Sequence, residues 1–303
     1  MKYQPQQRSF QGSQVRLCYF EWGPEQGQPD AEETVLLVHA TGFHARCWDR
    51  TVAALPDGLR VIAVDMRGHG RSEKRNPYVW KTFGHDLQEL VEALGLRQAV
   101  GVGHSMGGHS LTQVAALLPG AFRRLVLVDP VIFDPDAYRT DRYRGFATAE
   151  DHPVARRRND WASWEEMYER FKDRHPFSRW VPEVLEDYCR YGILPKADGQ
   201  GFELACPPVV EASVYLGNTE TDVHQLIPRL ELPVVVLRAR PRGPDDVEVM
   251  DFSKSPTWPG LAAEFKHGRD VYLPDHSHFI PMEDPELVAR FIADANAQAG
   301  STG

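Results

Sequence analysis

A serine stands at a sharp boundary between a buried strand and a helix in the middle of this chain. The pentapeptide Gly103-His104-Ser105-Met106-Gly107 directly follows the apolar run 98–102. A serine flanked by glycines two positions away on each side, between a strand and a helix, is typical of the strained turn that exposes a nucleophile above a parallel sheet. Only small residues leave room where strand and helix approach so closely. The pattern therefore predicts an α/β architecture with Ser105 as a nucleophile.

Apolar runs and helical segments alternate along most of the chain. This order favours a mostly parallel sheet flanked by helices. Short runs rich in β-branched and other apolar residues predict strands at 15–22, 34–38, 61–64, 99–102, 125–128, 234–237 and 271–273. Amphipathic spacing and capping residues predict helices over 82–94, from Ser105 onward, and over 285–295.

Residues 134–225 interrupt this alternation. The segment has no buried-strand signature, is rich in aromatic residues, and shows helical spacing around 164–171. We therefore expect a helical cap inserted into a core that is made of residues 1–133 and 226–303. Such a cap would form the roof of a substrate pocket.

Charge and cysteine usage narrow the range of partners. The net charge of −9 disfavours nucleic acid and anionic membranes. The first residues lack the apolar stretch of a signal peptide, and no apolar run reaches the length of a membrane span. Four scattered cysteines, at 18, 47, 189 and 206, predict reduced thiols and no metal site. We expect a cytoplasmic protein that acts on a small molecule, while the oligomeric state stays open.

Four segments resemble the α/β-hydrolase superfamily. Residues 38–43 look like its oxyanion loop, 65–72 like its D-x-R-G-x-G-x-S turn, 103–108 like its nucleophile turn, and 278–285 like the segment that opens its last helix. The resemblance covers the chain apart from the cap. It implies the α/β-hydrolase fold and a serine–histidine–acid mechanism that needs no cofactor or metal.

The resemblance also assigns roles to individual residues. By position, the backbone N–H groups of Thr41 and Met106 would bind the oxyanion, although Ala40 stands where the family usually has glycine. In this fold the acid and then the histidine follow the serine in the chain. The base is therefore expected to be His278, and His276 is expected to be a loop residue.

The acid of the triad is the least determined member. Asp251 is the first choice, because its distance in sequence from His278 is near the usual spacing of the family. The other candidates are Asp129, at the end of the strand predicted at 125–128, and the carboxylates of the loop that contains Asp251, namely Asp245, Asp246 and Glu248.

These residues predict a serine hydrolase that cleaves carboxylic esters through an acyl-enzyme. A serine at the nucleophile position excludes the epoxide hydrolases and haloalkane dehalogenases of this fold, which use an aspartate there. The alternatives are a lactonase acting on cyclic esters, a hydrolase of carbon–carbon bonds, and a small-molecule receptor with low turnover.

Overall fold

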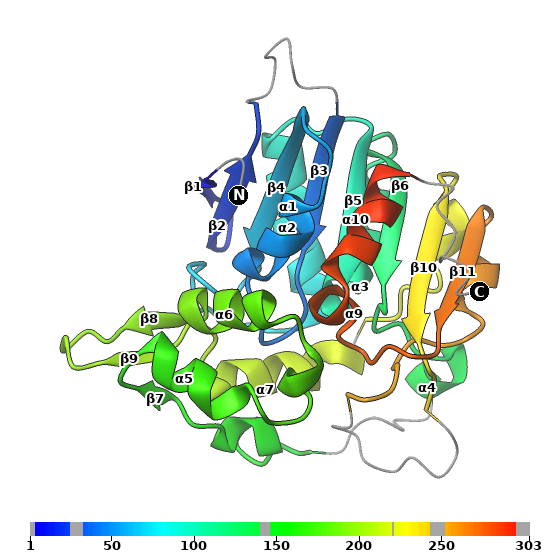
Figure 1. Ribbon diagram of the computed structural model, residues 1–303. Coiled ribbons are helices and arrows are strands. Elements are labelled where there is room, and N and C mark those ends of the chain that lie inside the picture. Colours follow the sequence, from blue (N-terminus) through cyan, green and yellow to red (C-terminus); the bar gives the residue numbers. More distant parts are fainter. Residues whose placement is uncertain (1–3, 25–32, 140–145, 220, 243–251, 295–303) are drawn as a thin grey trace.

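The computed structural model describes residues 4–24, 33–139, 146–219, 221–242 and 252–294. Within these residues an eight-stranded sheet has the order β1-β2-β4-β3-β5-β6-β10-β11 (Figure 1). The strands are β1 Gln6–Gln11, β2 Arg16–Trp22, β3 Glu33–Val38, β4 Leu59–Asp65, β5 Ala99–His104, β6 Phe122–Val128, β10 Val234–Ala239 and β11 Gly268–Leu273. β1 and β2 pair antiparallel at one edge, and the strands from β4 to β11 run parallel.

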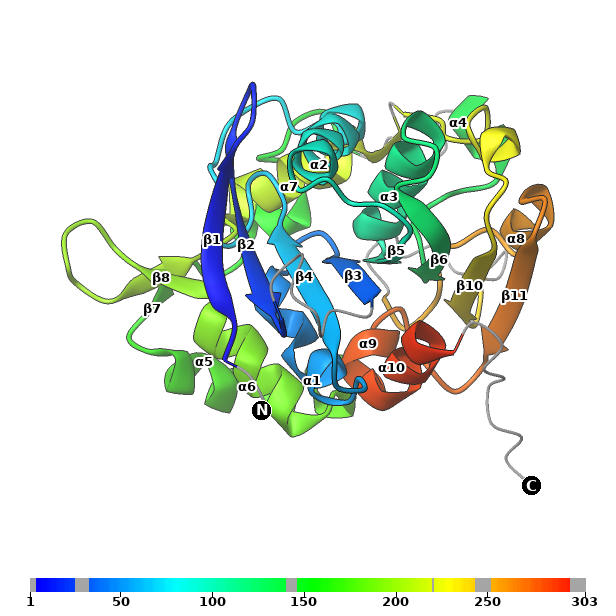
Figure 2. The same ribbon diagram turned by 90° about the horizontal axis from the view of Figure 1, so that it is seen from above.

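Helices cover both faces of this sheet (Figure 2). One face carries α1 Asp49–Ala53 and α10 Pro285–Ala293, which follows the short α9 Ile280–Glu283; the other carries α2 Trp80–Ala93, α3 Met106–Leu117 and α8 Leu261–Glu264. No helix among the described residues is long and apolar enough to span a bilayer. The prediction of a mostly parallel sheet flanked by helices is confirmed.

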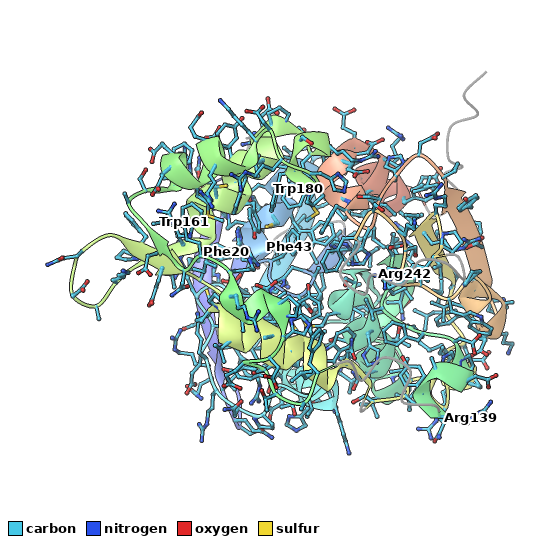
Figure 3. All side chains as sticks on the ribbon, turned by 90° about the horizontal axis from the view of Figure 1, so that it is seen from below. Phe20, Phe43, Arg139, Trp161, Trp180 and Arg242 are labelled. Carbon is cyan, nitrogen blue, oxygen red and sulfur yellow. The ribbon has the colours of Figure 1, made fainter. Side chains whose placement is uncertain are left out.

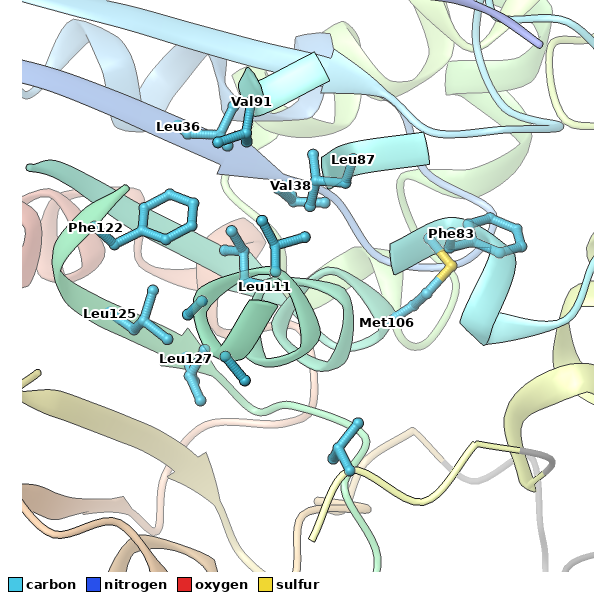
Figure 4. Close-up of a cluster of buried hydrophobic side chains, with 14 of the residues drawn as sticks. Leu36, Val38, Phe83, Leu87, Val91, Met106, Leu111, Phe122, Leu125 and Leu127 are labelled. Carbon is cyan, nitrogen blue, oxygen red and sulfur yellow. The ribbon is translucent and has the colours of Figure 1, made fainter. Parts of the chain in front are cut away.

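Burial on both faces explains why the parallel strands read as continuous apolar runs. In β3, for example, Leu36 and Val38 belong to the core cluster under α2 and α3 (Figure 4), whereas Val35 and Leu37 belong to the cluster under α1 and α10. Each predicted run lies in a strand, except that Val15 precedes β2. The edge strand β1 was missed, because its exposed sequence of mostly polar residues carries no apolar signal.

The segment between β6 and β10 lies below the carboxyl ends of the parallel strands in Figure 1. It contains α4 Pro135–Arg139, α5 Trp164–Phe171, α6 Pro182–Tyr191 and α7 Pro208–Leu216, together with the strands β7 Asp160–Trp161, β8 Ile193–Pro195 and β9 Phe202–Leu204. The three strands form a small antiparallel sheet, which the sequence did not predict, beside the helices of this segment. Strands of two or three residues are too short to show alternation. We keep residues 134–225 as the proposed cap.

An aromatic cluster joins the cap to the core. The ring of Phe43, on a core loop, lies 5.7 Å from that of Trp180 in the cap, and Figure 3 labels both residues. The ring of Tyr188, also in the cap, lies 5.3 Å from that of Phe43. An ion pair between Arg179 of the cap and Glu283 of the core adds a contact at 2.9 Å. The cap is therefore seated on the core through buried rings, and a partly exposed ion pair adds to this contact.

Candidate active site

Ser105 occupies the turn between β5 and α3 in a strained backbone conformation. Its φ of 56° and ψ of −118° lie in a region that L-residues rarely adopt. A Cβ on Gly103 would lie 2.5 Å from the backbone of Gly107, and a Cβ on Gly107 would lie 2.2 Å from the carbonyl oxygen of Val38. The two glycines are thus required by close backbone contacts. Strain of this kind costs about 1–3 kcal/mol and is typical of functional turns.

Three buried side chains form a chain of hydrogen bonds at this turn. The Ser105 hydroxyl lies 3.1 Å from Nε2 of His278, and Nδ1 of His278 lies 2.6 Å from a carboxylate oxygen of Asp129. The residues come from the carboxyl ends of β5, β11 and β6, which meet at one edge of the sheet. This arrangement allows the imidazole to accept the serine proton while a carboxylate faces its other nitrogen.

The Asp129 carboxylate is held on both of its oxygens. One oxygen accepts hydrogen bonds from the backbone N–H of Ala239 at 2.9 Å and from the hydroxyl of Ser255 at 2.6 Å. The other accepts from Nδ1–H of His278. Like Ser105, Asp129 has a positive φ, 43°. These contacts leave the carboxylate a single orientation.

Asp251, the first choice from sequence, lies outside the described residues, as do Asp245, Asp246 and Glu248. The nitrogen of His278 that an orienting acid must contact is bonded to Asp129 instead. This contact favours Asp129, the alternative acid, which stands at the end of β6 directly beside the histidine loop. The sequence spacing that favoured Asp251 carries no information about this contact.

The loop that carries His278 is fixed from several sides. The backbone N–H of His278 donates to the carbonyl of Phe252 at 3.1 Å, and the carbonyl of His278 accepts from Nε2–H of His104 at 2.8 Å. The ring of Phe252 stacks on the imidazole, with centroids 5.8 Å apart. His276 lies 3.9 Å from Asp284 and makes no contact with the serine. The placement of His276 outside the triad agrees with its prediction as a loop residue.

Two residues near Ser105 have backbone N–H groups that the fold leaves available: Thr41, which lines the same cavity, and Met106, which directly follows Ser105. Met106 begins α3, so its N–H belongs to the first turn, which has no acceptor within the helix. In the loop after β3, the N–H of Gly42 donates to His69 and that of Phe43 to the carbonyl of Ala40. Among the described residues, none accepts from the N–H of Thr41. Thr41 and Met106, the two positions predicted from sequence, can thus both donate to a developing oxyanion.

Buried histidines hold the loop of Thr41 in place. Nε2 of His39 accepts from the N–H of Met66 at 2.9 Å, and its Nδ1–H donates to the carbonyl of Ala40 at 2.7 Å. His69 uses its Nε2 in the same way to accept from the N–H of Gly42 at 3.0 Å. An imidazole that accepts on one nitrogen must be neutral. Burial lowers the pKa of His39 and of His69, which keeps both rings neutral.

We expect the free energy of unfolding to fall steeply when the pH drops below about 6.5. Burial lowers the pKa of His109 to about 4 and that of His44 to about 3, and it also lowers the pKa of His39, His69 and His104. These rings stay neutral in the folded chain, whereas in the unfolded chain they bind protons below about pH 6.5. Each therefore contributes stability that is complete above that pH and is lost at about 1.4 kcal/mol per pH unit below it.

Urea unfolding at pH 7, 6 and 5 measures this effect. Buried carboxylates work in the opposite direction and offset part of the effect of the histidines: burial raises the pKa of Asp49 to about 6, and it also raises the pKa of Asp86, Asp187 and Glu211. In His109→Gln the free energy of unfolding should depend less steeply on pH, because about one proton fewer is taken up on unfolding. A free energy of unfolding that is equal at pH 7 and pH 5 would contradict the expectation.

A buried ion pair of the cap packs against the oxyanion loop. Glu211 of α7 pairs with Arg157, and the guanidinium of Arg157 also donates to the hydroxyl of Tyr188 at 3.1 Å. The Glu211 carboxylate lies so near Gly42 that a Cβ there would be 2.5 Å from it. Burial raises the pKa of Glu211. The run of three arginines at 156–158 gave no sign of this pairing in the sequence.

A cavity of about 70 Å³ lies in front of Ser105 and His278. Its wall is mostly apolar and aromatic, and it includes side chains from both core and cap. The apolar and aromatic members are Trp80, Val131, Phe133, Phe146, Tyr215, Leu216, Phe252 and Pro256; the polar members are Thr41, Ser105, His152, Asn218, Arg242 and His278. The cap thus forms part of the wall opposite the nucleophile. Sequence reasoning missed His152 and Phe252, since nothing in their local sequence marks them.

Comparison with known proteins shows the family of this chain. A model of the family described as "Alpha/beta hydrolase family" matches residues 35–291. A bifunctional esterase/perhydrolase of Acinetobacter calcoaceticus is 26% identical over 302 residues, which cover 90% of this chain and 93% of that protein. A non-heme chloroperoxidase of Streptomyces lividans is 40% identical over 120 residues, or 39% of this chain; the aligned segment spans 42% of that relative's length.

Solved structures show the same fold. The crystal structure of an E-2-(acetamidomethylene)succinate hydrolase superposes with a TM-score of 0.74, at 20% identity, over 95% of this chain and 98% of that one. At this identity the likeness concerns the arrangement of helices and strands alone.

Proposed function

We propose that this chain, which belongs to the alpha/beta hydrolase family, hydrolyses carboxylic esters through an acyl-enzyme formed on Ser105. The observation that carries the proposal is the hydrogen-bond chain from Ser105 through His278 to Asp129, beside two N–H groups that can receive an oxyanion. The strained turn at Ser105 supports it, because such strain is maintained where a nucleophile must be presented. The word "esterase" in the name of the Acinetobacter relative agrees with it.

The geometry suggests the following sequence of steps. The Ser105 hydroxyl attacks the acyl carbon while Nε2 of His278 takes its proton. The N–H groups of Thr41 and Met106 stabilise the tetrahedral oxyanion, and each such donor is typically worth about 3 kcal/mol of barrier. His278 then gives the proton to the leaving oxygen, which releases the alcohol. Water, deprotonated by His278, attacks the acyl-enzyme and releases the acid.

We assign the orienting acid to Asp129 in place of Asp251. A carboxylate that accepts from Nδ1–H keeps Nε2 unprotonated and turned toward the serine, and it stabilises the imidazolium formed during attack. The ordinary acyl-enzyme route uses side chains and backbone N–H groups for every step, so no cofactor is part of the proposal.

The size of the cavity indicates compact substrates. For comparison, an enclosed cavity of about 150 Å³ binds benzene, and the space beside Ser105 is about 70 Å³. The p-nitrophenyl leaving group, which all the test esters share, would therefore extend out of this space, and the length of the acyl chain decides the fit. We therefore expect kcat/KM for p-nitrophenyl butyrate to exceed that for the decanoate by at least about tenfold, because a long acyl chain would have to displace the cap. In Leu216→Ala, which removes part of the cavity wall, the ratio should fall.

A panel of p-nitrophenyl esters from acetate to decanoate, with lactones beside it, tests this expectation. Faster turnover of the decanoate would contradict the size argument. Small lactones are cyclic esters that react by the same steps, and their compact shape keeps lactonase activity as the second candidate. Turnover of lactones alone would favour the lactonase. Tight binding without turnover would favour the low-turnover receptor.

We also keep a cytoplasmic location as part of the proposal. Cys18, Cys47, Cys189 and Cys206 are all buried and form no disulfide, as expected in a reducing compartment.

A further inference from the structure

A histidine of the cap presents an N–H group at the cavity. His152 is 3% exposed, lines the cavity with Ser105 and His278, and directly precedes the short helix η2 Pro153–Arg156. Its Nδ1 accepts from the backbone N–H of Val154 at 3.2 Å and so caps η2. Burial lowers the pKa of His152, which keeps the ring neutral. A neutral imidazole that accepts on Nδ1 carries its proton on Nε2.

No group in the described part of the chain accepts from this Nε2–H. Nε2 of His152 is not among the buried atoms that lack a partner, so it is accessible from the cavity that His152 lines. A ligand that fills the cavity removes water from this N–H group, and an apolar group placed there would leave the donor unpaired, so the site favours a ligand that brings an acceptor. The reacting carbonyl has its own donors, the N–H groups of Thr41 and Met106 on the core. His152 lines the same cavity and belongs to the proposed cap.

The orientation of the His152 ring is fixed before any ligand binds. It stacks on Tyr215 with centroids 5.3 Å apart and planes 4° from parallel, and the ring of Phe146 packs edge-on at 4.7 Å. The backbone N–H of His152 donates to the carbonyl of Ala149 at 3.2 Å. A donor held by stacking, capping and backbone contacts loses little freedom on binding, which is the property of a recognition group.

We infer that Nε2–H of His152 binds a second acceptor oxygen of the substrate, separate from the carbonyl that Ser105 attacks. The inference rests on the proposed function and names its substrate class. The substrate is a compact ester that carries an ether or carbonyl oxygen in its acyl or its alcohol part. An ester with a methylene group at that position leaves the donor unpaired and binds more weakly.

Binding to the Ser105→Ala variant tests the inference without turnover. Two matched pairs differ by one methylene replaced by oxygen: methyl methoxyacetate against methyl butyrate in the acyl part, and 2-methoxyethyl acetate against butyl acetate in the alcohol part. NMR titration gives the dissociation constants. We expect one pair to show a preference of about tenfold for the oxygen-containing member. A preference in the first pair places the acceptor in the acyl part of the substrate, and a preference in the second pair places it in the alcohol part.

His152→Asn, added to Ser105→Ala, is the decisive variant. Asparagine still caps η2 by accepting from the N–H of Val154, but its side chain is too short to replace Nε2–H. The preference should vanish in this variant and persist in Tyr215→Phe, which removes only a hydroxyl from the same wall. Preference lost in Tyr215→Phe but kept in His152→Asn would overturn the inference, as would equal binding of both members in both pairs.

A second measurement needs no change at His152. In Ser105→Ala labelled with 15N-histidine, the Nε2–H proton of His152 should shift downfield with the oxygen-containing ester and not with its methylene counterpart. An unchanged signal at saturation would overturn the inference. Failure of the proposed function is recognised by a different measurement: the wild-type protein would then hydrolyse none of these esters.

Discussion

Ester hydrolysis is expected to fall by roughly 10⁵- to 10⁶-fold when Ser105 is replaced by alanine, because no other group can form the acyl-enzyme. A fluorophosphonate should label the wild-type protein once, at Ser105, with a matching increase in mass. Labelling and p-nitrophenyl butyrate turnover are measured on the same samples. Unchanged turnover in Ser105→Ala would overturn the serine mechanism.

Ser105→Gly is the matched control for folding. The φ of 56° at this position strains any residue with a Cβ, whereas glycine adopts positive φ freely. We expect Ser105→Gly to unfold at a higher urea concentration than Ser105→Ala, because its free energy of unfolding should be larger by about 1 kcal/mol. Both variants should be inactive. Ester hydrolysis by either variant would show that the reaction does not need the Ser105 hydroxyl.

Asp129→Asn is expected to lower kcat by about 10⁴-fold, the cost of removing the orienting carboxylate in serine proteases. The amide keeps the size of the side chain but loses the charge that stabilises the imidazolium. Thermal melting and p-nitrophenyl butyrate kinetics separate this effect from unfolding. The assignment holds if the melting temperature changes little while kcat falls.

Asp251→Asn is the companion variant, and we expect it to stay within a few-fold of wild type. Ser255→Ala should have an intermediate effect, because it removes one of the two hydrogen bonds to the far oxygen of Asp129. If Asp251→Asn were inactive and Asp129→Asn active, with both folded, the acid would belong to the loop after β10 and the contact to His278 would not be the catalytic one.

The main strands and the turn at Ser105 could be predicted because local physics determines them. A strand segment buried on both faces must be apolar, as residues 35–38 of β3 and 99–103 of β5 are. A strand–helix turn this tight excludes a Cβ at Gly103 and Gly107. The base was also accessible, since His278 follows the last strand in the chain order expected for this fold. The edge strand β1 and the short strands of the cap carry too little apolar signal to be predicted.

The choice of acid and the wall of the cavity required the tertiary structure. Asp129 and Asp251 were both plausible by position. What favours Asp129 is the contact of 2.6 Å between its carboxylate and Nδ1 of His278, which lies 149 positions later in the chain. His152 looks like any cap histidine until folding stacks it on Tyr215 and faces it toward Ser105. The sequence by itself determines which segments are buried and where the nucleophile turn lies, because those depend on near neighbours in the chain. Which side chains meet at that turn depends on how distant strands and the cap pack together.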